Sequence, residues 1–179
     1  MKAWIFSIGL MAMQLCCPSV MSASLNEGWY QFSSKDGGCS ISFPAQPNLV
    51  QQSIQIAEGQ YLHYDIYLAP MEDKGVCMLL VATYPISLSG AQEVAGLEGL
   101  LKGIVGHHID NKLIFSRLVE YAGHPAMNFL VRSLSNYFRG QAVMIGNKLY
   151  LVAMEGRKSE LNETVFERFL ESLKIHNRN

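Results

Sequence analysis

The stretch MLLVA at residues 78–82 decides the class of fold, because all of its side chains are apolar. Successive side chains of a strand point to opposite faces of a sheet, so protein must cover both faces of this strand. The segments AVMI (142–145) and LYLVAM (149–154) also consist of apolar side chains. The sequence therefore predicts a sheet whose central strands are buried on both sides.

The connections between the strand-like segments are short and rich in glycine, as at residues 36–38, 58–59 and 146–147. Such connections favour antiparallel neighbours. The strand at 61–69 alternates in polarity and is expected to be half exposed, with one face made of Tyr61, His63, Asp65 and Tyr67. The expected strands are 29–34, 39–44, 49–56, 61–69, 76–84, 111–121, 126–134, 137–145 and 148–155.

Two segments have the three- and four-residue apolar spacing of a helix. The first covers residues 89–105, with an apolar side made of Val94, Leu97, Leu101 and Ile104. The second follows Ser159, the expected N-cap, and has the apolar stripe Leu161, Val165, Phe166, Phe169, Leu170 and Leu173. With one helix on each face, we predict an α+β fold, a three-layer α/β/α sandwich around a central, mostly antiparallel sheet.

The composition excludes several classes of protein. The chain has 179 residues, of which 14 are basic and 15 acidic, with a net charge of -1. We expect no nucleic-acid partner, because that binding depends on concentrated positive charge. An apolar content of 49% is too high for a disordered chain. The sequence therefore predicts a globular domain.

The N-terminal residues 1–23 have the three-part pattern of a secretory signal peptide, with Lys2, an apolar stretch over residues 3–17, and small residues after Pro18. We predict export to the periplasm or cell envelope of a bacterium. The alternative is a lipoprotein attached through Cys16 or Cys17, and only this alternative places the chain on a membrane. The rest of the chain, residues 24–179, is predicted to be a single domain, because no linker or repeat interrupts it.

Removal of the signal peptide leaves two cysteines, Cys39 and Cys77, each at the start of an expected strand. An oxidising compartment allows disulfides to persist. We expect a Cys39–Cys77 disulfide if the two strand starts lie side by side. The alternative is two separate buried thiols.

The sequence lacks the common nucleophile and phosphate-binding motifs, so we assign no catalytic residue and expect no cofactor. His107, His108 and Asp110 form the best candidate metal site, although a solvated helix end explains them equally, and no metal is assigned. His63 and Asp65 share one strand face and are either a general-base pair or an ordinary polar pair. Arg132 and Arg139 are too sparse for a phosphate-binding patch.

Glycines recur at three- and four-residue intervals in the first helix, at Gly96, Gly99, Gly103 and Gly106. Each glycine inside a helix costs about 1 kcal/mol relative to alanine. Such a stripe lets another backbone approach closely, so Gly96, Gly99 and Gly103 are candidate partner-binding residues. The alternative is an irregular segment without a partner.

Several segments resemble the PsbP-like proteins, namely FSSKDGGCSISFPAQP (32–47), VCMLLVATYP (76–85), YAGHPAMNFLV (121–131), GNKLYLVAMEG (146–156) and FERFLESLKI (166–175). The shared features are a strand that ends in Phe-Pro, a Gly-x-Pro turn, and a closing helix with Phe-Leu-x-Ser-Leu, and they cover most of residues 29–175. The resemblance implies a three-layer α/β/α domain. Proteins resembling this family include an extrinsic subunit that helps retain inorganic ions at photosystem II, and exported bacterial proteins of unassigned role.

The resemblance carries over no set of catalytic residues, and a shared fold does not imply a shared function. We therefore expect an exported, non-enzymatic binding or assembly module of the bacterial cell envelope, with an envelope protein as partner. The oligomeric state is left open. The alternative is a small-ligand or metal-binding protein, with hydrolysis as one version of it.

Overall fold

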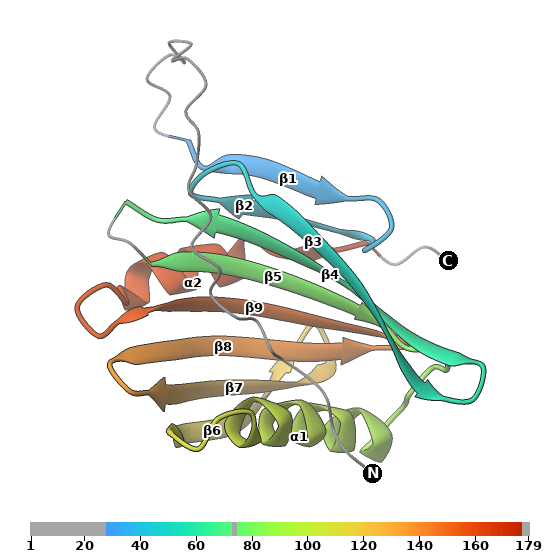
Figure 1. The fold of residues 1–179 in the computed structure, drawn as a ribbon. Coiled ribbons are helices and arrows are strands. Elements are labelled where there is room, and N and C mark those ends of the chain that lie inside the picture. The colour runs from blue at the N-terminus through green and yellow to red at the C-terminus, as the bar shows by residue number, and fades with distance from the viewer. Residues whose placement is uncertain (1–27, 73–74, 177–179) are drawn as a thin grey trace.

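The computed structural model describes residues 28–72 and 75–176 (Figure 1). The signal peptide expected at residues 1–23, with Cys16 and Cys17, lies outside the described residues. The strands are β1 (Tyr30–Ser34), β2 (Cys39–Phe43), β3 (Asn48–Ala57), β4 (Gln60–Pro70), β5 (Val76–Thr83), β6 (Asn111–Tyr121), β7 (His124–Ser133), β8 (Asn136–Ile145), β9 (Lys148–Arg157) and β10 (Lys174–Ile175). The helices are α1 (Ala91–Gly106) and α2 (Glu163–Glu171).

Seven strands form one antiparallel sheet in the order β3-β4-β5-β9-β8-β7-β6. Five of the six neighbouring pairs are hairpin partners in sequence, and the sixth pair joins β5 to β9 in the middle. In this central pair Leu79 lies opposite Val152 and Val81 opposite Tyr150. The central position of β5 and β9 explains why the two most apolar segments have no polar face.

The two faces of this sheet have separate cores, and alternate residues of β5 belong to different cores. On one face, Met78 and Leu80 pack with Leu97 and Leu101 of α1, which lies across β6, β7 and β8. On the other face, Leu79 packs in the core that contains residues of α2 and β2. Figure 1 shows the two helices on opposite sides of the sheet. We call these the α1 face and the α2 face.

The α2 face is also covered by a second sheet, with the strand order β1-β2-β10. Its inward residues Cys39, Ile41 and Phe43 are almost completely buried against Phe166 and Phe169. The expected α+β class with helices on both faces is confirmed. The separate three-stranded sheet and the two-residue strand β10 were not expected.

The expected cap at Ser159 is wrong. Ser159 lies in a turn over residues 158–160, which is closed because the Arg157 backbone N–H donates to Glu160 Oε2 at 2.7 Å. Helix α2 begins at Glu163, and Asn162 caps it by accepting from the backbone N–H groups of Thr164 (2.9 Å) and Val165 (3.4 Å). Serine and asparagine are both favoured at helix N-caps. The turn at residues 158–160 delays the start of the helix, so Asn162 and not Ser159 becomes the cap.

Cys39 and Cys77 are free and buried. The structure therefore shows the second of the two alternatives, separate thiols, and not the expected disulfide. Burial raises the pKa of Cys39 to about 11 and that of Cys77 to about 12. Neither α1 nor α2 has the length and apolar character that a bilayer-spanning helix requires.

Candidate functional site

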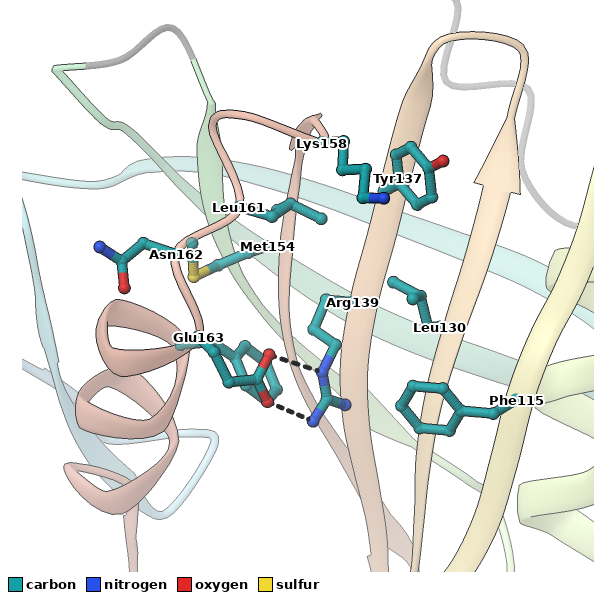
Figure 2. A pocket seen from close by; sticks show the side chains of 10 residues that line it. Phe115, Leu130, Tyr137, Arg139, Met154, Lys158, Leu161, Asn162 and Glu163 are labelled. Carbon is teal, nitrogen blue, oxygen red and sulfur yellow. Dashed lines mark hydrogen bonds and ion pairs between the residues drawn. The ribbon is translucent and has the colours of Figure 1, made fainter.

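A hollow of about 440 Å³ lies on the α2 face, between the sheet and the start of α2 (Figure 2). We call it the Arg139 groove. Its apolar wall consists of Phe115, Leu130, Met154, Leu161 and Phe166. Its polar lining consists of Tyr137, Arg139, Lys158, Asn162 and Glu163. Four strands, the loop after β9 and helix α2 therefore contribute to one site.

Arg139 of β8 lies at the centre of the groove, and its side chain is only 11% exposed. Its Nη1 atom donates to the side-chain oxygen of Asn128 and to the carbonyl oxygens of Phe129 (3.3 Å) and Gly140 (3.5 Å). Its Nη2 and Nε atoms donate to the two carboxylate oxygens of Glu163, at 2.9 and 3.4 Å. The guanidinium group is thus fixed on one side by the sheet and paired on the other side with α2.

Two aromatic rings hold the same guanidinium group. Its central carbon lies 4.3 Å from the centre of the Phe166 ring and 5.2 Å from that of Phe115. A guanidinium group over an aromatic face is stabilised by the ring quadrupole, whose negative part lies over the face. These contacts join strand β6 to helix α2 through Arg139.

The mouth of the groove is more polar and more exposed than its floor. Glu163, the first residue of α2, has a side chain that is 59% exposed. Lys158 lines the same hollow (Figure 2) and forms no ion pair with any residue that the structure describes. The lining therefore carries two positive charges and one negative charge.

Strand β6 is one edge of the large sheet and presents four large apolar side chains to solvent. Leu113, Ile114, Phe115 and Leu118 are between 40% and 52% exposed. A strand at the edge of a sheet also leaves a row of backbone donors and acceptors unpaired. We call the strand with these four side chains the β6 edge; Phe115 belongs to it and to the Arg139 groove.

His63 and Asp65 form separate hydrogen bonds to the neighbouring strand β3. His63 Nδ1 lies 2.7 Å from the hydroxyl of Ser53, and Asp65 Oδ1 accepts from Gln51 Nε2 at 2.8 Å. The hollow that they line measures about 210 Å³. The arrangement is that of cross-strand polar pairs and not of a general base held by a carboxylate.

The candidate metal ligands after α1 are only partly brought together. His108 Nδ1 lies 3.3 Å from Asp110 Oδ2, and both side chains are about half exposed. Nowhere in residues 28–72 and 75–176 do three or more His, Cys, Asp or Glu side chains gather as a metal site would need.

The glycine stripe of α1 is divided by the fold. A Cβ atom on Gly96 would lie 2.9 Å from Met144 Cε, so this residue packs on the sheet side. At Gly99 and Gly103 a Cβ atom would meet nothing within 4 Å. Gly99 and Gly103 stay predicted partner-binding residues, whereas the space at Gly96 is taken by Met144 of the same chain.

Arg139 was not expected to be a site residue, because Arg132 and Arg139 are too far apart along the chain to form a basic patch. The useful signal was an arginine inside a strand, between Phe138 and the buried stretch that begins at Gly140. A charged side chain at such a position is seldom buried unless it is paired.

No family model matches the sequence, and no curated protein matches it. Among solved structures, the solution structure of cyanobacterial PsbP (CyanoP) from Synechocystis sp. PCC 6803 matches 91% of this chain and 99% of its own, with a TM-score of 0.59 and 11% identity. A crystal structure from Bacteroides thetaiotaomicron matches 86% of this chain and 50% of its own, with a TM-score of 0.37 and 13% identity. The first match shows that this chain has a PsbP-like fold, as the sequence resemblance implied.

Proposed function

We propose that this chain is a non-enzymatic binding or assembly module that is exported to the bacterial cell envelope, and that it binds a protein partner through the β6 edge. The observation that carries the proposal is the exposure of Leu113, Ile114, Phe115 and Leu118 on an edge strand. Natural proteins protect sheet edges with charges, prolines or short strands, since an exposed apolar edge pairs readily with another chain. An extended segment of the partner is therefore the expected binding element.

The opposite edge of the sheet supports this choice. Strand β3 has polar residues at its centre, and Gln51, Gln52 and Ser53 are bonded to side chains of β4. The exposed apolar side chains of β3 (Leu49, Val50 and Ile56) lie towards its two ends, whereas on β6 three of them, Leu113, Ile114 and Phe115, are consecutive. Such a contiguous apolar group is typical of interaction surfaces.

The state of the two cysteines argues against one kind of enzyme, one that uses a cysteine nucleophile. Burial raises the pKa of Cys39 to about 11 and of Cys77 to about 12. Both thiols are therefore protonated at neutral pH, and the thiolate is the reactive form of cysteine.

Photo-crosslinking in the cells that produce the protein tests the partner surface. A photoreactive amino acid at Ser116, exposed on β6, should give a discrete protein adduct, and Leu118→Asp should reduce its yield at least about tenfold. The control position is Glu167, exposed on α2, where the same adduct should not form. Equal adducts at both positions, or an adduct that Leu118→Asp leaves unchanged, would contradict the proposal.

Mass spectrometry of the intact protein from the same cells tests the proposed export. A chain cleaved near residues 22–24 would support a signal peptide over residues 1–23. A chain that keeps residues 1–23 would contradict it, and a lipid on Cys16 or Cys17 would identify the membrane-attached form.

A further inference from the structure

We propose that the Arg139 groove binds a small amphipathic carboxylate, with Arg139 holding the carboxylate group and the apolar wall holding the hydrocarbon part. This inference goes beyond the proposed function, because it concerns a small molecule on the α2 face and not a protein strand at the sheet edge. The carboxylate site and the protein-binding edge can each be correct when the other is wrong.

Arg139 is already arranged as a carboxylate receptor. The Nη1 atom is directed to Asn128 and to two backbone carbonyl groups, which leaves Nε and Nη2 as the pair that faces the groove. Two parallel N–H donors of a guanidinium group match the two oxygens of a carboxylate. Because the sheet and two aromatic rings fix the group, a ligand loses little free energy in ordering it.

Glu163 shows where the ligand carboxylate would lie. Its two oxygens accept from Nη2 and Nε at 2.9 and 3.4 Å, as the dashed lines in Figure 2 show. Arg139 is only 11% exposed and needs an anionic partner, whereas the Glu163 side chain is 59% exposed and is hydrated where it lies. An external carboxylate would keep Arg139 paired in place of Glu163, and water would solvate the Glu163 carboxylate.

The rest of the lining favours an anion with an apolar body. Phe115, Leu130, Met154, Leu161 and Phe166 form the wall, and Lys158 adds a second positive charge. The volume of about 440 Å³ is within the range of about 300–1,000 Å³ that is usual for small-molecule sites. An inorganic anion such as phosphate would leave this apolar wall without a partner, whereas a hydrocarbon tail would cover it.

Titration calorimetry with decanoate, at concentrations where it stays monomeric, tests the proposal on the wild-type chain. Decanol has the same tail without the charge and should bind at least about tenfold more weakly. Arg139→Met should weaken decanoate binding about tenfold or more, because charge-assisted hydrogen bonds are lost. Arg157→Met is the matched control, because Arg157 also pairs with a glutamate but is 60% exposed and lies outside the groove lining. This variant should bind decanoate with the affinity of the wild type. Equal binding of decanol and decanoate, or no binding of decanoate, would overturn the proposal.

A second pair of variants covers the case in which Arg139→Met does not fold. Glu163→Ala removes the internal carboxylate and should make decanoate bind about two- to fivefold more tightly. Glu167→Ala removes the same charge one turn further along α2, from a side chain outside the groove lining, and should leave the affinity unchanged. Unchanged or weaker binding by Glu163→Ala, or an equal gain in both variants, would contradict the proposal, because the ligand carboxylate would then not take the position of Glu163.

Discussion

The two faces of the seven-stranded sheet are covered in different ways. On the α2 face, the rings of Phe43 and Phe169 are fully buried, and their centres lie 5.0 Å apart. The short helix α2 there has its own side-chain cap, Asn162. On the α1 face, the longer helix α1 has Gly90 as its N-cap residue and no side-chain cap hydrogen bond, and its buried residues are Glu93, Leu97 and Leu101.

The difference concerns where the stability of each helix originates. Helix α1 includes four glycines, so its intrinsic stability is low and it depends on packing by Leu97 and Leu101. Helix α2 combines a cap with two fully buried rings. We infer that α1 opens locally at a lower free energy than α2, while the aromatic core of the α2 face opens only with global unfolding.

Phe169→Ala has the largest expected effect on this comparison. The Phe169 ring is fully buried and contacts the rings of Phe43 and Trp29, with centres 5.0 and 6.1 Å away. Its removal leaves a cavity and should lower the free energy of unfolding by about 3–5 kcal/mol. Urea denaturation measures the loss. A decrease below about 1 kcal/mol would mean that the α2 face repacks freely and does not anchor the fold.

The two thiols provide the next test, because both lie on the closed α2 face. Cys39 and Cys77 should not react with an aromatic disulfide reagent at neutral pH until the chain unfolds, since both are buried and protonated. A cysteine introduced by Gly99→Cys, where the added side chain meets open space on α1, should react at once. Rapid reaction of the native thiols would contradict the closed face, and a chain with no titratable thiol after unfolding would show that they are bridged.

The same thiols make stability depend on alkaline pH. Their pKa values, about 11 for Cys39 and about 12 for Cys77, lie above the ordinary value of 9.0. The unfolded chain therefore loses these protons at lower pH than the folded chain does. The stabilisation is complete below about pH 9 and is lost as the pH rises through about 11 to 12. Cys39→Ala should flatten this decline in pH-dependent urea denaturation, and an unchanged slope would contradict the shift.

The central sheet was predictable from sequence because its signal is local. The stretch at 78–82 and the segment at 149–154 are apolar at every position, are short, and lie between glycine-containing segments, which is typical of strands covered on both faces. The second sheet depends instead on the pairing of Lys174 with Ser40, residues at opposite ends of the domain, and no local pattern records such a pairing.

The Arg139 groove was not predictable for the same reason. Arg139 and Glu163 are 24 residues apart in sequence and lie in a strand and a helix. The alternation of side chains along β8 assigns Arg139 to one face of the sheet. It does not predict that Glu163, the first residue of α2, and Phe115 of β6 contact Arg139 on that face. Sequence periodicity thus gives the elements and their buried faces, whereas a site made by three elements requires their arrangement in space.

The smallest expected effects distinguish the glycines of α1 from one another. Gly99→Ala and Gly103→Ala place a methyl group in open space, and each should raise the free energy of unfolding by about 0.5–1 kcal/mol. Gly96→Ala should gain less, because its methyl group would lie 2.9 Å from Met144 Cε and the buried Met144 side chain must shift. Thermal unfolding of the three variants measures the difference. An equal gain in stability at all three positions would mean that the α1 face packs loosely even at Met144. A gain at Gly99 and Gly103 alone would show that α1 packs tightly against the sheet. The low stability of α1 would then originate in the glycines on its open side.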